Sequence, residues 1–151
     1  REAALRLFAA AGKIYALKSN QCIYPRLLLY TDDLAEVDLL LREFGGAKSE
    51  RHNGGYTWQL TSKADCSALL DDLFGTGLLA GYRKLLASLA YLLTEPLNTE
   101  LQFEIFNEMK RVVSSQSSQL SPAFLSQLAR GEPSEPSAES LAAEDVVLQD
   151  E

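Results

Sequence analysis

The sequence predicts an α+β fold, in which a four-stranded antiparallel sheet carries helices on one face and further helices follow. The first observation is that segments of strand-like alternation occur as two consecutive pairs, each joined by turn residues. The second is that segments with apolar residues at helical spacing precede, separate and follow these pairs. The third is that hydrophobic residues make up 46% of the 151 residues, which suffices for a folded core.

The N-terminal part of the sequence predicts a short helix and a first hairpin. Apolar residues recur at helical spacing up to Gly12, a residue type that is favoured where helices end. Pro25 cannot donate a ladder hydrogen bond, so we expect an edge position or a bulge there. The predicted elements are a helix over residues 1–12, a strand over 13–18, a turn over 19–21 and a strand over 22–30.

A second helix and a second hairpin follow the first. Thr31 and Asp32 favour the start of a helix, and Gly45 marks its end. The residues at 53–55 are Asn-Gly-Gly, which tolerate the positive φ of a tight turn and therefore predict a hairpin. Its strands are expected over residues 47–52 and 56–61. The apolar face of the helix is predicted to hold Leu34, Val37, Leu40, Leu41 and Phe44.

Three further helices are predicted before the composition changes. They cover residues 63–74, 78–93 and 98–113, and Ser62 and Asn98 are the expected N-caps of the first and third. From residue 114 the chain is poor in apolar residues and carries seven acidic residues against one basic residue. We therefore expect one folded domain over residues 1–113 and a largely flexible, low-complexity acidic tail over 114–151, with room for a short helix at 122–130.

The predicted sheet is positively charged, and the helices behind it are negatively charged. Segments 13–31 and 47–63 hold six basic residues and one acidic residue, Glu50. Segments 32–46 and 64–77 hold eight acidic residues and one basic residue. The net charge of −7 argues against a nucleic-acid partner for the whole chain, but this polarity within the domain favours one for the sheet.

Alternation along the strands sharpens this prediction, because helices should cover the apolar face and leave the other open. The open face is expected to show Lys13, Tyr15, Tyr24, Arg26, Thr57, Gln59 and Thr61. Basic groups bind phosphates, Gln and Thr reach base edges, and Tyr stacks on bases. The alternative interpretation is that this face is polar only because it is exposed to solvent. The candidate nucleic-acid-binding residues are Lys13, Tyr15, Lys18, Tyr24, Arg26, Lys48, Arg51, Thr57, Gln59, Thr61 and Lys63.

Few residues in this sequence point to other chemistry. The two cysteines, Cys22 and Cys66, and the single histidine, His52, are too few for a zinc site, so no metal or cofactor is expected. One histidine gives little support to a Ser/His/Asp or Cys/His nucleophile. We expect two reduced cysteines in the core, His52 in a solvated loop and Trp58 in the core. No run of about 18 apolar residues occurs, so no membrane-spanning helix is expected.

The order of features between Tyr24 and Leu73 resembles that of the LAGLIDADG homing endonucleases. It comprises a Pro-Arg-Leu strand, an acidic residue opening an amphipathic helix, Phe-Gly-Gly, a hairpin, and Tyr-x-Trp-x-Leu-x-Ser-Lys before a Leu-rich helix. The resemblance covers about residues 4–93. It implies an αββαββα unit and makes residues 1–113 a LAGLIDADG-like nucleic-acid-binding domain.

The motif that names this family should lie in the first helix, over residues 4–12. Leucine, alanine and glycine positions match it, but the two acidic positions are Ala9 and Ala11. In the family the second acid holds divalent metals, so the resemblance implies no catalytic residue, no metal and no enzyme activity. It also implies a possible homodimer or protein partner through residues 4–12, although Arg6 stands where a small residue is expected.

The resemblance therefore leads us to expect an inactive member that binds structured RNA, either rRNA or intron RNA. Such a protein would be a component of an organellar ribonucleoprotein such as the mitochondrial ribosome, or a splicing helper. The implied location is the mitochondrion, with the chloroplast as the alternative. Two other functions stay open. One is an active DNA endonuclease, which needs an acid at position 9 or 11 or one supplied by a partner subunit. The other is a protein-interaction module in which the sheet or the C-terminal helices bind another protein, with the helix faces at Leu101, Ile105 and Val112 as candidates.

Overall fold

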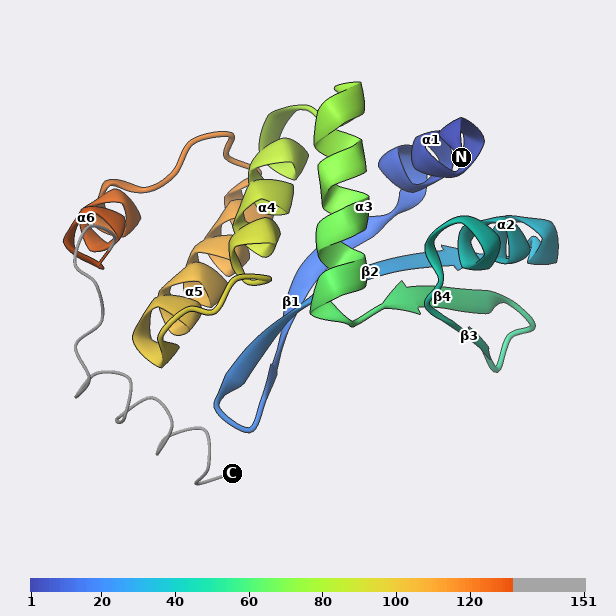
Figure 1. Ribbon diagram of the computed structural model, residues 1–151, viewed down its shortest axis with the longest axis horizontal. Coiled ribbons are helices and arrows are strands. Elements are labelled where there is room, and N and C mark those ends of the chain that lie inside the picture. The colour runs from blue at the N-terminus through green and yellow to red at the C-terminus, as the bar shows by residue number, and fades with distance from the viewer. Residues whose placement is uncertain (132–151) are drawn as a thin grey trace.

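Four antiparallel strands form one sheet, and the helices lie on one side of it (Figure 1). The computed structural model describes residues 1–131 of the chain. The order of the strands is β1-β2-β4-β3, so that β2 and β4 are central. The predicted α+β class with an antiparallel sheet is confirmed. The strands are β1 (Lys13–Ser19), β2 (Cys22–Thr31), β3 (Ala47–Glu50) and β4 (Tyr56–Leu60).

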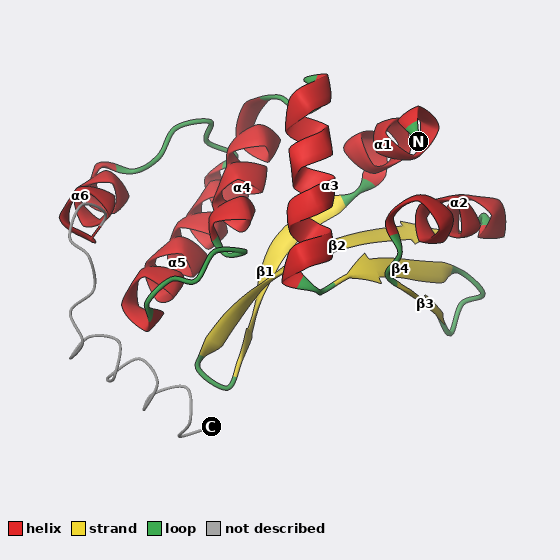
Figure 2. Cartoon of the chain, viewed as in Figure 1, coloured by secondary structure: helices red, strands yellow, loops and turns green. Residues whose placement is uncertain are grey.

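The helices follow the expected order (Figure 2), and hydrogen bonds confirm the predicted caps of α3 and α5. Ser62 Oγ accepts a hydrogen bond from the Asp65 N–H at 3.3 Å. Asn98 Oδ1 accepts one from the Leu101 N–H at 2.7 Å. The described helices are α1 (Glu2–Ala11), α2 (Leu34–Phe44), α3 (Lys63–Thr76), α4 (Gly81–Leu92), α5 (Thr99–Ser115) and α6 (Pro122–Gly131).

The start of α2 differs from the prediction by one or two residues. Its N-cap is Asp33, whose Oδ1 accepts from the Ala35 N–H at 2.9 Å. Thr31 remains in β2 and accepts from the Asp33 N–H at 3.0 Å, which fixes the entry into the helix. Leu34 was expected on the buried face but is 40% exposed, because it occupies the first turn, ahead of the buried Val37.

The second strand is paired differently along its two halves. β1 pairs with β2 from Leu28 back to Cys22, whereas β4 pairs with β2 only from Leu27 to Thr31. Pro25 therefore lies where β2 has a single neighbouring strand, and the predicted edge position is confirmed. Residues 15–26 form a two-stranded ribbon that extends beyond β4, as the lower part of Figure 1 shows.

The core lies between the sheet and the helices, with Trp58 fully buried in it as predicted. The Trp58 ring lies 5.9 Å from that of Phe8 and 6.2 Å from that of Phe44, centroid to centroid. Its Nε1–H donates to the Gly45 carbonyl oxygen at 2.8 Å, so the one polar atom of the indole is satisfied. Trp58 thereby joins α1, α2 and β4.

The helical part of the molecule continues past residue 113, where the domain was expected to end. α5 runs to Ser115, and α6 packs on it through the buried Phe124. The short helix allowed at 122–130 is therefore present. The remainder of the predicted tail, residues 132–151, lies outside the described part of the chain. No helix in residues 1–131 is long and apolar enough to cross a membrane.

Candidate nucleic-acid interface

The side of the sheet that faces away from the helices carries most of the predicted site residues, and we call it the open face. Tyr15 lies opposite Arg26, Lys13 opposite Leu28, and Leu17 opposite Tyr24. Leu28 and Tyr30 lie in turn opposite Gln59 and Thr57 of β4. Strand alternation puts all these side chains on one side. The open face thus comprises Lys13, Tyr15, Leu17, Tyr24, Arg26, Leu28, Tyr30, Thr57 and Gln59, with Arg51, Thr61 and Lys63 at its rim.

Each tyrosine of the open face has a cation beside it. Lys13 Nζ lies 5.3 Å, and Arg51 Cζ 4.6 Å, from the centroid of the Tyr30 ring. Lys63 Nζ lies 5.9 Å from the centroid of the Tyr24 ring. These contacts bring Arg51 and Lys63, which lie beyond the strand ends, over the same surface as Lys13.

Four cations of this surface are free of carboxylate partners. Lys13, Arg26, Arg51 and Lys63 form no ion pair within residues 1–131, whereas the ion pairs present there involve Arg1, Arg6, Arg42 and Arg111. Cations that no acid neutralises give the open face a positive potential. Such a surface attracts a polyanion.

Arg26 is held more firmly than the other three cations. Its Nη1 donates to the Tyr15 hydroxyl at 3.2 Å, and its Cζ lies 5.9 Å from the centroid of the Tyr15 ring. Its Nε is buried without a hydrogen-bond partner. The guanidinium therefore has a fixed orientation and donors that the described residues leave unused.

Two predicted site residues, Lys18 and Lys48, do not lie on the open face. Lys18 pairs with the buried Ile23 in the ladder, and its Nζ lies 5.1 Å from the centroid of the Phe103 ring of α5. Lys48 lies opposite the core residue Trp58. Both lysines were predicted from the total charge of their segments. Neighbouring residues of a strand point to opposite faces of the sheet, so the charge of a segment does not tell which face carries it.

Tyr30 and Leu17 were left out of the predicted site although they lie on the open face. Tyr30 is 45% exposed and Leu17 is 38% exposed. Alternation alone would have found Tyr30, because it follows Arg26 and Leu28 at a spacing of two. Leu17 carries no polar group, so a search for charged and hydrogen-bonding residues could not find it.

The end of α1 does not fit the divalent metal that the resemblance associates with this fold. Ala9 is buried, and Ala11 offers only a methyl group. Arg83 of α4 donates to the carbonyl oxygens of Ala9 and Gly12, the latter at 2.8 Å. A guanidinium at this end of the helix repels a metal cation. No group of three or more His, Cys, Asp or Glu side chains within residues 1–131 could hold a metal ion.

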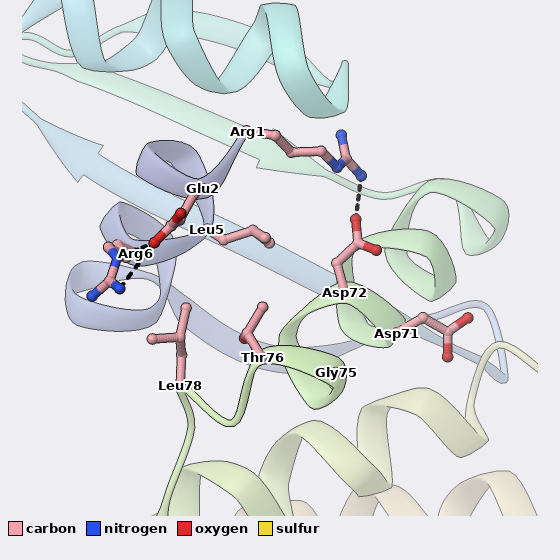
Figure 3. A pocket seen from close by; sticks show the side chains of 9 residues that line it. All are labelled: Arg1, Glu2, Leu5, Arg6, Asp71, Asp72, Gly75, Thr76 and Leu78. Atoms are coloured by element: carbon pink, nitrogen blue, oxygen red, sulfur yellow. Dashed lines mark hydrogen bonds and ion pairs between the residues drawn. The ribbon is translucent and has the colours of Figure 1, made fainter.

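A hollow of about 630 Å³ lies between the start of α1 and the end of α3, on the helical side of the molecule (Figure 3). Its acidic residues do not converge on a common point. Asp72 pairs with Arg1, Glu2 pairs with Arg6 at 3.0 Å, and Asp71 points away from α1. These paired carboxylates lie apart from the open face, so the hollow is not part of the candidate interface.

The cysteines and the histidine have no catalytic setting in the described residues. Burial raises the pKa of the Cys66 thiol to about 12, and a neighbouring Asp65 carboxylate adds to this effect. Cys66 lies in the core as predicted, whereas Cys22 is only half-buried and lies at the tip of the ribbon. His52 is exposed beside the turn at Asn53, in line with the predicted loop position.

Comparison with solved structures identifies the fold, although no family model and no curated protein matches the sequence. The LAGLIDADG homing endonuclease I-SmaMI bound to cleaved DNA is 15% identical, with a TM-score of 0.59 over 88% of this chain and 49% of its own. The archaeal intron-encoded homing endonuclease I-Vdi141I complexed with DNA is 10% identical, with a TM-score of 0.63 over 88% and 96%. I-CvuI in complex with its target is 14% identical, with a TM-score of 0.60 over 85% and 94%.

The chain therefore has the LAGLIDADG fold that the sequence resembles, and it spans about half the length of I-SmaMI. The αββαββα unit with additional C-terminal helices is confirmed. At these identities the likeness establishes the fold.

These comparisons also correct the expected function. An inactive, RNA-binding component of a ribosome or other ribonucleoprotein is wrong as a prediction, because the matched structures are homing endonucleases that act on DNA. The wide major groove of B-form DNA can be read by protein side chains, whereas the corresponding groove of an RNA duplex is too narrow to be read.

The helix face that was named for the protein-interaction alternative packs inside the domain. Ile105 and Val112 of α5 are fully buried, and Leu101 is partly buried against the same core. This helix face packs inside the domain and is not available to another protein.

Proposed function

We propose that this chain binds duplex DNA through its open face and serves as one DNA-binding unit of a homing endonuclease. The observation that supports the proposal is the set of four unpaired cations on one surface: Lys13, Arg26, Arg51 and Lys63. The matched structures with this fold include DNA complexes, which agrees with the choice of DNA.

The chemistry of the face supports binding in a groove. The exposed Lys13 and Arg51 can reach phosphates, and Gln59 and Thr57 lie on the central strand β4, from which they can reach base edges. Phosphate contacts give affinity and position, and base contacts give sequence preference. The open face offers both kinds of side chain.

For cleavage, we propose that the carboxylates come from a second unit, because the end of α1 carries none. The chain spans about half the length of I-SmaMI, so a second unit of similar size fits the comparison. The exposed side of α1 includes the small residues Ala3, Ala10 and Ala11, which would allow another helix to come close. An organellar location stays a prediction.

The binding proposal is tested by selecting duplexes from a random pool and measuring their affinity by fluorescence anisotropy over a range of salt concentrations. Two double variants give a matched comparison, because each removes two positive charges: Lys13→Ala/Lys63→Ala on the open face and Lys18→Ala/Lys48→Ala away from it. Each lost phosphate contact lowers the slope of log K against log salt by about 0.9. We expect a decrease of about 2 for the first variant and little change for the second.

Equal weakening by both double variants, or no binding of duplex DNA by the wild type, would overturn the proposal. The role of a second unit is tested on a plasmid that carries the selected site, with magnesium present. The chain alone should bind this plasmid and leave it uncut. Cutting or nicking by the chain alone would show that the carboxylates lie within it.

A further inference from the structure

We infer that Arg26, positioned by Tyr15, reads a guanine in the major groove. This inference rests on the proposed DNA-binding function and adds to it the residue that selects a base. It is carried by three features of the described residues: the ribbon, the contacts of Arg26, and the match between its donors and a base edge.

The ribbon has the width that a major groove admits. Between Tyr15 and Arg26 the two strands have no third strand beside them, because β4 pairs with β2 from Leu27 onward, and α5 packs on the ribbon from the side opposite the open face. Neighbouring strands lie about 4.8 Å apart, and the groove is about 12 Å wide, so the open face of these two strands fits along the groove. Asn20 and Gln21 have φ values of 50° and 55°, which give the ribbon a tight two-residue turn at its tip.

Arg26 lies at the base of this ribbon with its guanidinium already oriented. Its Nη1 bonds to the Tyr15 hydroxyl, and no carboxylate pairs with it among the described residues. Its Nε is buried without a partner, so the donors left for a ligand are those of Nη1 and Nη2. The bond to Tyr15 fixes the rotamer before a ligand binds.

The ligand that fits this arrangement is a guanine rather than a phosphate. Guanine presents O6 and N7 side by side in the major groove, and an arginine can donate to both. Phosphates line the walls of the groove, where exposed side chains such as Lys13 and Arg51 can follow them. Arg26 is half-buried on a central strand and is restrained by Tyr15, so it is placed to contact the floor of the groove.

Tyr15 is a positioning residue in this inference. Its hydroxyl accepts from Nη1, and its ring lies beside the guanidinium, so each restrains the other. Tyr15→Phe removes the hydrogen bond and keeps the ring. Its effect should therefore be on the choice between bases rather than on the charge of the face.

The experiment replaces each guanine of the selected duplex in turn with 7-deazaguanine, which lacks the N7 acceptor and still pairs with cytosine. For the wild type we expect at least one position where this replacement weakens binding roughly 5- to 100-fold, the range for a bidentate contact. Arg26→Ala removes all donors of this side chain and should remove this penalty at that position alone. Tyr15→Phe should reduce the penalty, whereas Lys13→Ala should weaken binding to both duplexes equally.

Thermal melts of the variants verify that each one folds. A wild-type protein that binds the duplex without a penalty at any guanine would overturn the inference and leave the DNA-binding proposal standing. The same holds if Arg26→Ala retains the full penalty and weakens all duplexes equally, as the loss of a phosphate contact would. Failure to bind any duplex would overturn both.

Discussion

Gln102 Oε1 accepts a hydrogen bond from the Ile23 N–H at 3.2 Å and thereby joins α5 to β2. The same side chain donates from Nε2 to the Leu97 carbonyl oxygen at 2.9 Å. Gln102 is buried, so both polar atoms need these partners. Through this link α5 is tied to the ribbon close to the turn at its tip.

Gln102→Ala should destabilise the domain, because it leaves a buried backbone N–H and a carbonyl oxygen without partners. Such groups cost about 1–3 kcal/mol each when buried. Urea unfolding followed by circular dichroism measures the loss. Gln59→Ala, on the open face, is the matched control and should change the free energy of unfolding by less than about 0.5 kcal/mol. Similar values for both variants would contradict the structural role of Gln102.

A buried carboxylate at Glu108 holds α6 against α5. It accepts from the Ser121 N–H at 2.8 Å and from the Ser121 hydroxyl at 2.9 Å, and Arg111 donates to it at 2.7 Å. Burial disfavours the charged form, but the hydrogen bonds from Arg111 and Ser121 outweigh it and lower the pKa of Glu108. The carboxylate is 4% exposed, so these partners replace its water.

A carboxyl group whose pKa is lower in the folded state than in the unfolded state stabilises the fold above its unfolded pKa. That contribution is lost as the pH falls through the folded pKa. Glu108→Gln removes the charge at constant shape, so the variant should be less stable at pH 7 by about 1–3 kcal/mol. The difference from wild type should shrink below a pH of about 4.3. A difference that stays constant from pH 7 to pH 3 would argue against this assignment.

Much of the fold follows from local patterns, whereas the parts that depend on distant contacts do not. Ser62 and Asn98 could be recognised as caps because a cap bonds to a residue three positions ahead. Trp58 could be placed in the core from alternation. Arg83 at the end of α1, by contrast, lies more than seventy positions from Ala9, and no pattern predicts that contact.

The candidate site was predicted in part for the same reason. Lys13, Tyr15 and Arg26 follow strand alternation and lie together on the open face. Lys18 and Lys48 were chosen for their charge, and the register puts them on the other side. The partner was predicted as RNA because alanine at positions 9 and 11 was taken to mean that the protein does not cut DNA.

Two glycines allow a test of how closely α1 packs. A Cβ at Gly12 would lie 2.4 Å from Cδ1 of the buried Phe8, whereas a Cβ at Gly75 in α3 meets nothing within 4 Å. Gly12→Ala should therefore destabilise the domain by about 1–3 kcal/mol through overpacking. Gly75→Ala should stabilise it by about 0.5–1 kcal/mol, since alanine favours the helix. Thermal melts of both variants measure these opposite signs, and a change of the same sign in both would contradict the packing.

Chemical labelling of the two cysteines tests the open face independently. Cys22 can react in the folded protein, whereas Cys66 cannot. Cys66 is buried, its Sγ lies 3.5 Å from the Leu60 carbonyl oxygen, and its pKa is raised to about 12, so almost no thiolate forms at pH 8. Cys22 is half-buried and lies on the open side of the ribbon, opposite Ser19. Iodoacetamide at pH 8 should therefore label Cys22 in the native protein and Cys66 only after unfolding, as mass spectrometry of peptides can show.

Saturating duplex DNA should slow the labelling of Cys22, because a ribbon inserted in the groove shields its tip from the reagent. Unchanged labelling of Cys22 in the presence of bound DNA would place the DNA away from the ribbon.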